Sequence, residues 1–333
     1  MEVKGLLAAT ANRLGFLDAY ASLRGKMGKS QVAVLVYHRV SPPQVGGSLE
    51  PLNTQIFEKQ TEGYCRDYEV ISLDELTEKV YSGKPLPSKA VVITFDDGYK
   101  DNYLHAYPIL KRHHIPATIF LTTGHIGTNK PFWWDRIGYV IQHTSVSRLS
   151  LGELGDYSLQ SAPDKSRASL TITKRLQKLP EARKGLLIER LINTCQVDIP
   201  PNLGQELILS WDEIREMSSN GISFGAHSVN HPILTNIPLK QAKDEIILSK
   251  KEIEKRLNRE VSAFAYPNGD FNTEIVKLVK QAGFTCAVTV SDKFVSIEDD
   301  PYKLNRIWVC EDPNKFKVMF CGLWGDLRSV LNR

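Results

Sequence analysis

The stretch KAVVITFDDGYKDNY, residues 89–103, places two adjacent carboxylates at the end of a strongly apolar run. The run from Ala90 to Ile93 is typical of a buried strand, because a short β-branched segment bounded by polar residues fits a strand better than a helix. Asp96, Asp97 and Gly98 come directly after it. An Asp-Gly pair can simply mark a turn, but two like charges beyond a buried strand also suggest a ligand or a reaction.

The segments on either side of this stretch alternate between strand and helix patterns. Strands are predicted at 32–38, 69–73, 90–95, 117–123, 221–227, 261–267 and 285–290. Helices are predicted at 54–68, 74–83, 102–114, 239–258 and 272–283. Such alternation predicts an α/β fold with a parallel sheet and right-handed crossovers, and the number of repeats favours a (β/α) barrel. No GxGxxG or GxxxxGK[ST] motif follows a strand, which argues against nucleotide binding.

Two regions depart from this alternation and set the predicted domain organisation. Residues 1–30 show apolar residues at helical spacing, which predicts an amphipathic helix packed on the body of the protein, with peripheral membrane contact as the alternative. Residues 31–333 form the main domain. It is interrupted at about 125–209 by a mostly helical inserted lobe, whose segment 165–190 holds eight basic and two acidic residues. That charge indicates either a solvated helical face or a cap for an anionic part of a substrate.

The composition is that of an ordinary globular protein. Apolar residues make up 42% and charged residues 24%, and the net charge of +4 does not indicate a nucleic-acid partner. Five scattered cysteines without a CxxC pair indicate reduced thiols. We expect no membrane span and a cytoplasmic location, because no apolar run is long enough for a span or a signal peptide.

Polar side chains follow several predicted strands at their carboxyl ends, where parallel (β/α) folds gather their functional groups. They are His38, Asp96 and Asp97, His227 and His231, and the YPNGD segment at 266–270. If a helical turn begins at Ser228, the two histidines of HSVNH face one side and can hold one ion. Coincidence on a solvated helix is the alternative for such a pair.

Two histidines and one carboxylate leave open coordination positions, as in a catalytic metal site. Neighbouring residues that leave a strand point in different directions. One aspartate can therefore bind the ion while the other faces the bound water, whose pKa the ion lowers to about 7. A carboxylate that takes the proton contributes roughly 10² to 10⁴ in rate. The residues thus predict a hydrolytic metal site, with a non-haem iron oxygenase and a two-aspartate glycosidase as weaker alternatives.

Three motifs carry a resemblance to a known family. TFDDGY at 94–99, HSVNH at 227–231 and FAYPNGD at 264–270 resemble, in order, the leading motifs of the polysaccharide deacetylase (NodB-like carbohydrate esterase) family. The resemblance spans roughly 32–306 and is closest to the permuted poly-N-acetylglucosamine deacetylase type. It implies a distorted (β/α) barrel and metal-dependent hydrolysis of N-acetyl groups on an N-acetylated glycan or a lipid-linked sugar.

The resemblance also implies roles for single residues. Asp96 matches the general base, while Asp97, His227 and His231 match a triad for a divalent ion, with zinc preferred and cobalt, nickel or iron as alternatives. The backbone N–H of Asn268 matches the oxyanion donor.

Two positions depart from the common pattern of the family. The histidine usually found near the C-terminus is missing, because the last histidine of this chain is His231, so His38 of the YH pair at 37–38 is the candidate general acid. Arg306 is the candidate replacement for the base-orienting arginine, where Ala265 stands here. A non-catalytic glycan-binding protein that keeps the fold remains the alternative from another functional class.

Overall fold

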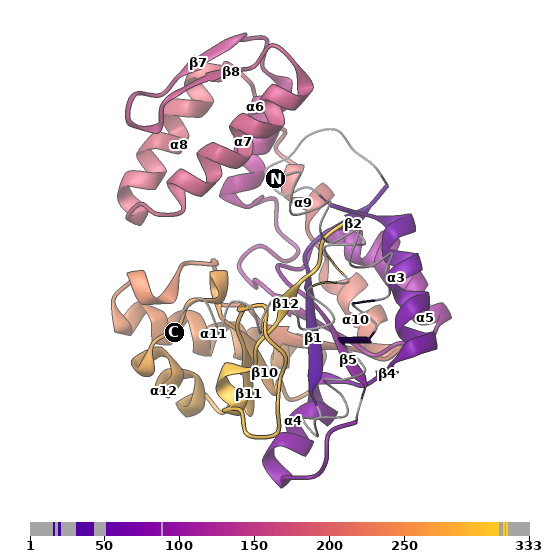
Figure 1. Ribbon diagram of the computed structural model, residues 1–333. Coiled ribbons are helices and arrows are strands. Elements are labelled where there is room, and N and C mark those ends of the chain that lie inside the picture. Colours follow the sequence, from indigo (N-terminus) through magenta and orange to yellow (C-terminus); the bar gives the residue numbers. More distant parts are fainter. Residues whose placement is uncertain are drawn as a thin grey trace.

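The computed structural model describes residues 31–42, 51–87 and 89–312, together with positions 16, 19, 20, 316 and 318. Its centre is a parallel sheet of eight strands (Figure 1). Seven of them follow the order β11-β10-β9-β6-β5-β1-β12, and the short strand β4 pairs with the start of β5. The strands are β1 (Val32–Tyr37), β4 (Glu69–Val70), β5 (Ala90–Phe95), β6 (Ala117–Leu121), β9 (Ile222–Ala226), β10 (Ala263–Ala265), β11 (Cys286–Val288) and β12 (Ile307–Trp308). The predicted α/β fold with parallel strands is confirmed.

The two ends of the sheet are joined by the segment that leads into β12. Leu304 forms a parallel bridge to Val288 of β11, and three residues later Ile307 pairs with Leu35 of β1. The Leu304 amide donates to the Ala287 carbonyl at 3.0 Å. The sheet thereby curls into the distorted barrel that was predicted.

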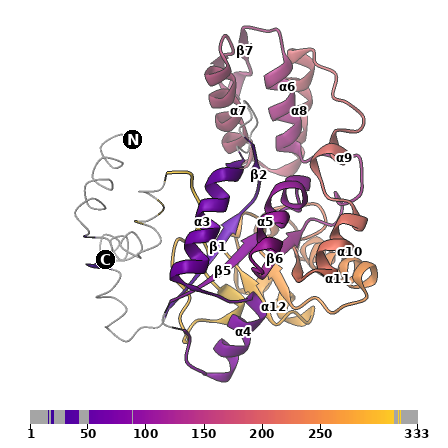
Figure 2. The same ribbon diagram turned by 90° about the vertical axis from the view of Figure 1, so that its right-hand side faces the viewer.

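Helices cover the outside of this barrel (Figures 1 and 2). They are α3 (Thr54–Asp67), α4 (Leu73–Ser82), α5 (Tyr107–Arg112), α10 (Trp211–Ser219), α11 (Leu239–Leu257) and α12 (Thr273–Gln281). Every residue of β1 and β5 is buried, as expected for strands with packed side chains on both faces. A π-helical turn at Asn102–Ala106 precedes α5, whose first turn contains Pro108. A proline cannot donate to the preceding turn, which accounts for the break in the predicted helix 102–114.

Between β6 and β9 the chain forms the predicted helical lobe, which stands at one end of the barrel in both views (Figures 1 and 2). Its elements are α6 (Trp133–His143), the antiparallel pair β7 (Arg148–Ser150) and β8 (Asp156–Ser158), α7 (Ala162–Leu176), α8 (Glu181–Cys195) and α9 (Leu203–Leu207). The lobe has an apolar cluster of its own, to which α6, α7 and α8 contribute. The exact boundaries of the domain and the lobe stay predictions.

Several other predictions concern parts of the chain away from the barrel. The amphipathic helix predicted at 1–30 lies outside the described residues, apart from three isolated positions. Cys65, Cys195, Cys286 and Cys310 are free thiols. Within the described ranges, the helices are too short or too polar to cross a bilayer.

Candidate active site

The carboxyl ends of neighbouring strands lie level with one another, which brings the loops beyond them together. Tyr37 pairs with Phe95, and Ala226 pairs with both Leu121 and Phe264. The hydrogen bonds between strands continue one residue beyond these pairs. The Asp96 N–H donates to the Tyr37 carbonyl at 3.0 Å, and the His227 N–H donates to the Leu121 carbonyl at 2.9 Å. The backbones of two predicted site residues are therefore held by the sheet itself.

Asp96 forms a buried ion pair with Arg306. Arg306 Nη1 and Nη2 donate to Asp96 Oδ1 and Oδ2, each at 2.7 Å, and Arg306 is fully buried. The guanidinium also donates to the Thr94 hydroxyl at 3.1 Å. Burial raises the pKa of Asp96, but the charge and hydrogen bonds of Arg306, together with the neighbouring His227 and His38, outweigh burial and hold that pKa below the usual range. Asp96 is thus an ionised carboxylate in a fixed orientation, held by direct contact with Arg306. The base-orienting role of Arg306 stays a prediction.

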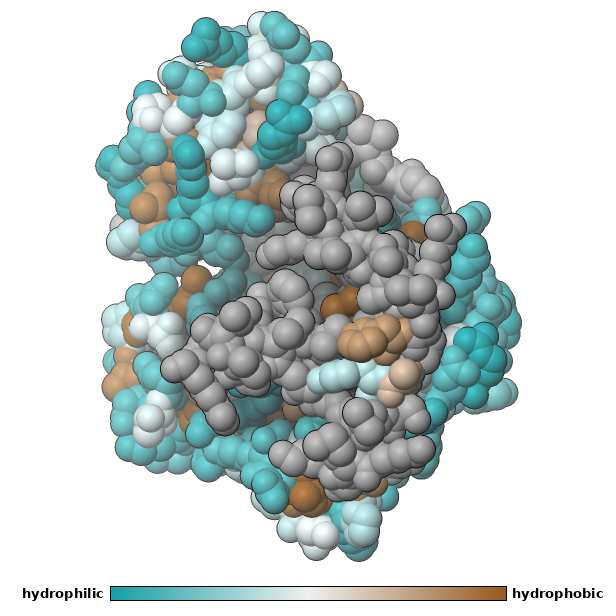
Figure 3. Space-filling view, in the orientation of Figure 1, coloured by the Kyte–Doolittle hydropathy of each residue, from teal (hydrophilic) through white to brown (hydrophobic). Residues whose placement is uncertain are grey.

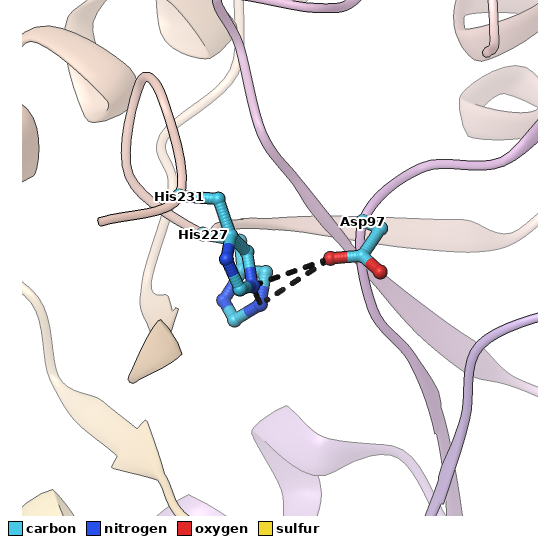
Figure 4. Close-up of side chains that lie close together, drawn as sticks. All are labelled: Asp97, His227 and His231. Atoms are coloured by element: carbon cyan, nitrogen blue, oxygen red, sulfur yellow. Dashed lines mark hydrogen bonds and ion pairs between the residues drawn. The ribbon is translucent and has the colours of Figure 1, made fainter. Parts of the chain in front are cut away.

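Asp97, His227 and His231 converge on one point (Figure 4). The two imidazole Nε2 atoms are 3.1 Å apart and lie 3.6 and 3.5 Å from Asp97 Oδ1. Ligands held tetrahedrally at the usual zinc distances of about 2.0–2.2 Å are roughly 3.3–3.6 Å from each other. Asp97 Oδ1 is buried and has no hydrogen-bond partner among the described residues. The spacing and the unpaired oxygen both fit a divalent ion.

The two imidazoles have the neutral state that a cation needs, whereas Asp97 would have to release its proton to bind one. Burial lowers the pKa of His227, and burial together with His227 lowers the pKa of His231 well below its usual value. Burial and the neighbouring Asp96 carboxylate raise the pKa of Asp97 well above its usual value. His227 Nδ1 lies 2.8 Å from the Ala265 carbonyl, which fixes the ring so that Nε2 faces the other two ligands.

The loop that carries the two histidines is not the helical turn that the spacing of four predicted. Ser228 and His231 have φ values of +64° and +58°, which is the left-handed region. Glu245 of α11 accepts the amides of Val229 and Asn230, both at 2.8 Å, and the Asn230 side chain at 2.8 Å. This buried carboxylate imposes the loop shape, so the rings meet through tertiary contacts instead of helical periodicity.

A second polar network, which was not predicted from the sequence, lies next to the His231 ring. The Tyr99 hydroxyl accepts from Trp134 Nε1 at 2.6 Å and donates to the Asp135 carboxylate at 3.2 Å. The Trp134 ring meets the His231 ring edge-on at a centroid distance of 5.0 Å. Burial raises the pKa of Asp135 to about 6. The WWD sequence at 133–135, in the first turn of α6, was the signal that could have indicated it.

His38 also lies at this end of the barrel, with its ring 4.6 Å from the ring of Trp308. Burial lowers the pKa of His38 to about 4, against the opposing effect of Asp96. The imidazole is therefore neutral near pH 7. Trp308 is 41% exposed and lines a cleft together with His38.

Asn268 lies in the turn after β10 and contacts the lobe. Its φ is +62°, and its side chain accepts from Gln177 Nε2 at 2.9 Å and donates to Asp270 at 2.7 Å. Gln177 caps the C-terminal end of α7, so one hydrogen bond joins the lobe to the barrel beside the site.

A cleft of about 310 Å³ lies between the lobe and the barrel mouth, at the small end of the range for ligand pockets. All the predicted site residues line it except Arg306, which lies beneath Asp96. The opposite wall comes from α6 and α7. In the space-filling view a notch separates the lobe from the barrel at the left edge (Figure 3).

Comparison with known proteins agrees with this arrangement. The sequence model of the polysaccharide deacetylase family matches residues 83–287, which is more than half of the chain. The chain is 24% identical over 323 residues to the poly-beta-1,6-N-acetyl-D-glucosamine N-deacetylase of Staphylococcus epidermidis, covering 92% of this chain and 90% of that protein.

Solved structures show the same fold. The deacetylase PplD of Streptococcus pyogenes, solved in complex with acetate, superimposes with a TM-score of 0.57 at 21% identity, covering 87% of this chain and 99% of that one. IcaB from Ammonifex degensii gives 0.57 at 18% identity, covering 88% and 97%. On the family match and the barrel fold together, the chain belongs to the polysaccharide deacetylase family.

Proposed function

We propose that this protein is a metal-dependent N-deacetylase that hydrolyses the acetamido group of an N-acetylhexosamine unit in a glycan or a glycolipid. The observation that carries the proposal is the convergence of Asp97, His227 and His231 at the ligand spacing of a tetrahedral ion, directly beside the ionised Asp96. Relatives named as poly-N-acetylglucosamine deacetylases support the choice of an acetamido substrate.

The three ligands would hold zinc, or cobalt, nickel or iron, through two neutral imidazole nitrogens and one carboxylate oxygen. Such an ion polarises the acetamide carbonyl and activates a water molecule near neutral pH. Three protein ligands leave room for substrate and water, which distinguishes this set from a closed structural site.

Asp96 is the proposed general base. It is not one of the three ligands, and Arg306 keeps it ionised and fixed in orientation. It takes one proton from the attacking water while the water oxygen bonds to the acyl carbon. The C–N bond then breaks, and the leaving amine needs a proton.

His38 is the proposed donor of that proton, and the backbone N–H of Asn268 is the proposed oxyanion donor. His38 is neutral near pH 7 when no substrate is bound, because its pKa is about 4. Negative charge that develops on the oxyanion beside it would raise this pKa, so that the ring takes a proton from solvent and passes it to the leaving amine. Asp96 returns the proton it took from water to solvent afterwards. The products are a free amine and acetate.

Metal content and acetate release test the proposal. We expect about one divalent ion per chain in the wild type, and loss of that ion in the double variant Asp97→Asn with His227→Ala. The control is Asp96→Asn, which should keep the ion. Its rate of acetate release from N-acetylglucosamine oligomers or a lipid-linked N-acetylated sugar should fall by roughly 10²-fold or more.

Absence of bound ion in the wild type after incubation with zinc, cobalt, nickel and iron would refute the proposed chemistry and favour a glycan-binding protein. The cytoplasmic location expected from the sequence stays a prediction, and cell fractionation would test it.

A further inference from the structure

One side of α7 forms a wall of the active-site cleft. Leu170, Thr173 and Lys174, followed by Gln177 at the helix end, are spaced by three and four residues and all line the cleft. Residues at this spacing lie on one face of a helix. The buried residues of the same helix, such as Ile172 and Leu176, pack into the core of the lobe. The helix therefore presents a second face to the site, made of Leu170 and three polar residues.

The cleft contains one cation that the proposed chemistry does not use. Of the described residues that line it, only Asp96 and Asp97 carry carboxylates. Arg306 neutralises Asp96, and Asp97 belongs to the proposed metal site. Lys174 has no ion pair or hydrogen bond from its ammonium group to any described residue.

Lys174 differs in this from several basic neighbours in the lobe, although the Lys178 ammonium group likewise has no ion pair or hydrogen bond to a described residue. Of these two lysines, only Lys174 lines the cleft. Lys184 pairs with Glu181, Arg183 with Glu153, and Lys165 donates to two backbone carbonyls. The Thr173 hydroxyl, next to Lys174, also has no hydrogen-bond partner within the described part of the chain, but its oxygen is buried. Lys174 is thus the exposed, unpaired donor on the cleft wall opposite the proposed metal site.

We propose that this face of α7 recognises an anionic group, a phosphate or a carboxylate, attached to the N-acetylhexosamine that is deacetylated, and that Lys174 binds it. The inference rests on the proposed function, because it assigns the same cleft to the sugar. A divalent ion, Arg306 and Lys174 together outweigh the two aspartates, so the cleft attracts anions. A neutral homopolymer would leave Lys174 without a partner.

Binding of two matched probes tests this inference without depending on turnover. N-acetylglucosamine 1-phosphate and N-acetylglucosamine differ only in the phosphate, and N-acetylmuramic acid supplies a carboxylate. Titration calorimetry on the zinc-loaded full chain should show tighter binding of at least one anionic probe by about tenfold, a ratio that falls as salt is added.

Variants then assign the effect to Lys174. Lys174→Gln should remove the preference, and Lys174→Arg should restore most of it. Lys178→Gln is the matched control, because Lys178 is also exposed but does not line the cleft. The inference is overturned if neither anionic probe binds better than N-acetylglucosamine, or if Lys174→Gln keeps the preference.

Failure of the two proposals can be told apart. A preference that depends on Lys174, in a protein that releases no acetate, would support the anionic subsite and refute the deacetylase reaction. Acetate release from neutral and anionic probes at equal efficiency, unchanged in Lys174→Gln, would support the deacetylase and refute the subsite.

Discussion

Arg306 and Asp96 form a bidentate ion pair in the interior of the barrel, with both nitrogen-to-oxygen distances at 2.7 Å. The two residues are 210 positions apart in the sequence. The pair keeps a carboxylate charged inside a protein core, beside the two histidines. It also fixes the direction in which that carboxylate faces the cleft.

Removal of Arg306 should therefore destabilise the fold. Arg306→Met leaves the Asp96 charge buried without a partner, and we expect a loss of about 3–5 kcal/mol in the free energy of unfolding, measured by urea denaturation. The double variant Arg306→Met with Asp96→Asn should recover part of this loss, because no uncompensated charge remains. Unfolding free energies equal to the wild type in the single variant would contradict the prediction.

Arg306→Lys separates orientation from charge. Lysine keeps the positive charge but cannot make two parallel hydrogen bonds. We expect kcat for acetate release to fall by up to about 10²-fold with a small change in KM, because misplacement of a reacting group costs rate more than binding. A rise in KM at unchanged kcat would argue for a role of Arg306 in substrate binding instead.

Glu245 should control metal affinity without touching the ion. Glu245→Gln replaces an acceptor of three hydrogen bonds by a side chain with an NH₂ group in the same place, so the loop that carries His231 loses its clamp. We expect zinc affinity, measured by competition with a chelator, to fall by about 10- to 100-fold. Asp244→Asn, at the exposed neighbouring position, is the control and should have no effect.

Asp135 should make the stability of the protein depend on pH. Its pKa is raised from 3.8 to about 6 in the folded state, so the folded state binds a proton that the unfolded chain has already lost. Ionisation of Asp135 therefore costs stability as pH rises from about 4 to above 6, by up to about 3 kcal/mol.

Asp135→Asn should remove that cost. We expect the gain in unfolding free energy of the variant over the wild type to be larger at pH 8, where Asp135 is ionised, than at pH 4. Urea unfolding of both proteins at both pH values measures this gain. An equal difference between the two proteins at the two pH values would contradict the assignment.

Bound zinc should stabilise the folded chain. At a free zinc concentration of 100 times Kd the gain is about 2.7 kcal/mol, which is measurable as a rise in Tm. The double variant Asp97→Asn with His227→Ala should show no such rise. An equal rise in both proteins would place the ion somewhere else.

The sequence predicted the parts of the site that depend on local pattern. The apolar run of 90–95 and the polar residues after it follow from strand periodicity, and parallel alternation then places Asp96, Asp97, His227 and His231 at one end of the barrel. The helical turn at Ser228 was wrong, because a carboxylate on α11 imposes the left-handed backbone there. Local spacing carries no information about that contact.

Other parts depend on contacts between distant segments and could not be derived from pattern. Arg306 was a candidate only through the family resemblance, since a single arginine in KLNRIWV has no local signal. The basic composition of 165–190 indicated a cap for an anion as one of two interpretations. Which of its lysines lines the cleft depends on how α7 packs on the lobe.

The closure of the barrel by residues 304–308 has a consequence for biosynthesis and turnover. His231, the last of the proposed metal ligands, is translated 75 residues before Arg306 (306 − 231), so the ribosome completes the ion-binding set well before the partner of Asp96 exists. A cut by a protease just upstream of Leu304 would separate both the closing segment and Arg306 from the rest of the chain. Assembly and inactivation of the proposed catalytic base are therefore tied to one short stretch near the end of the barrel.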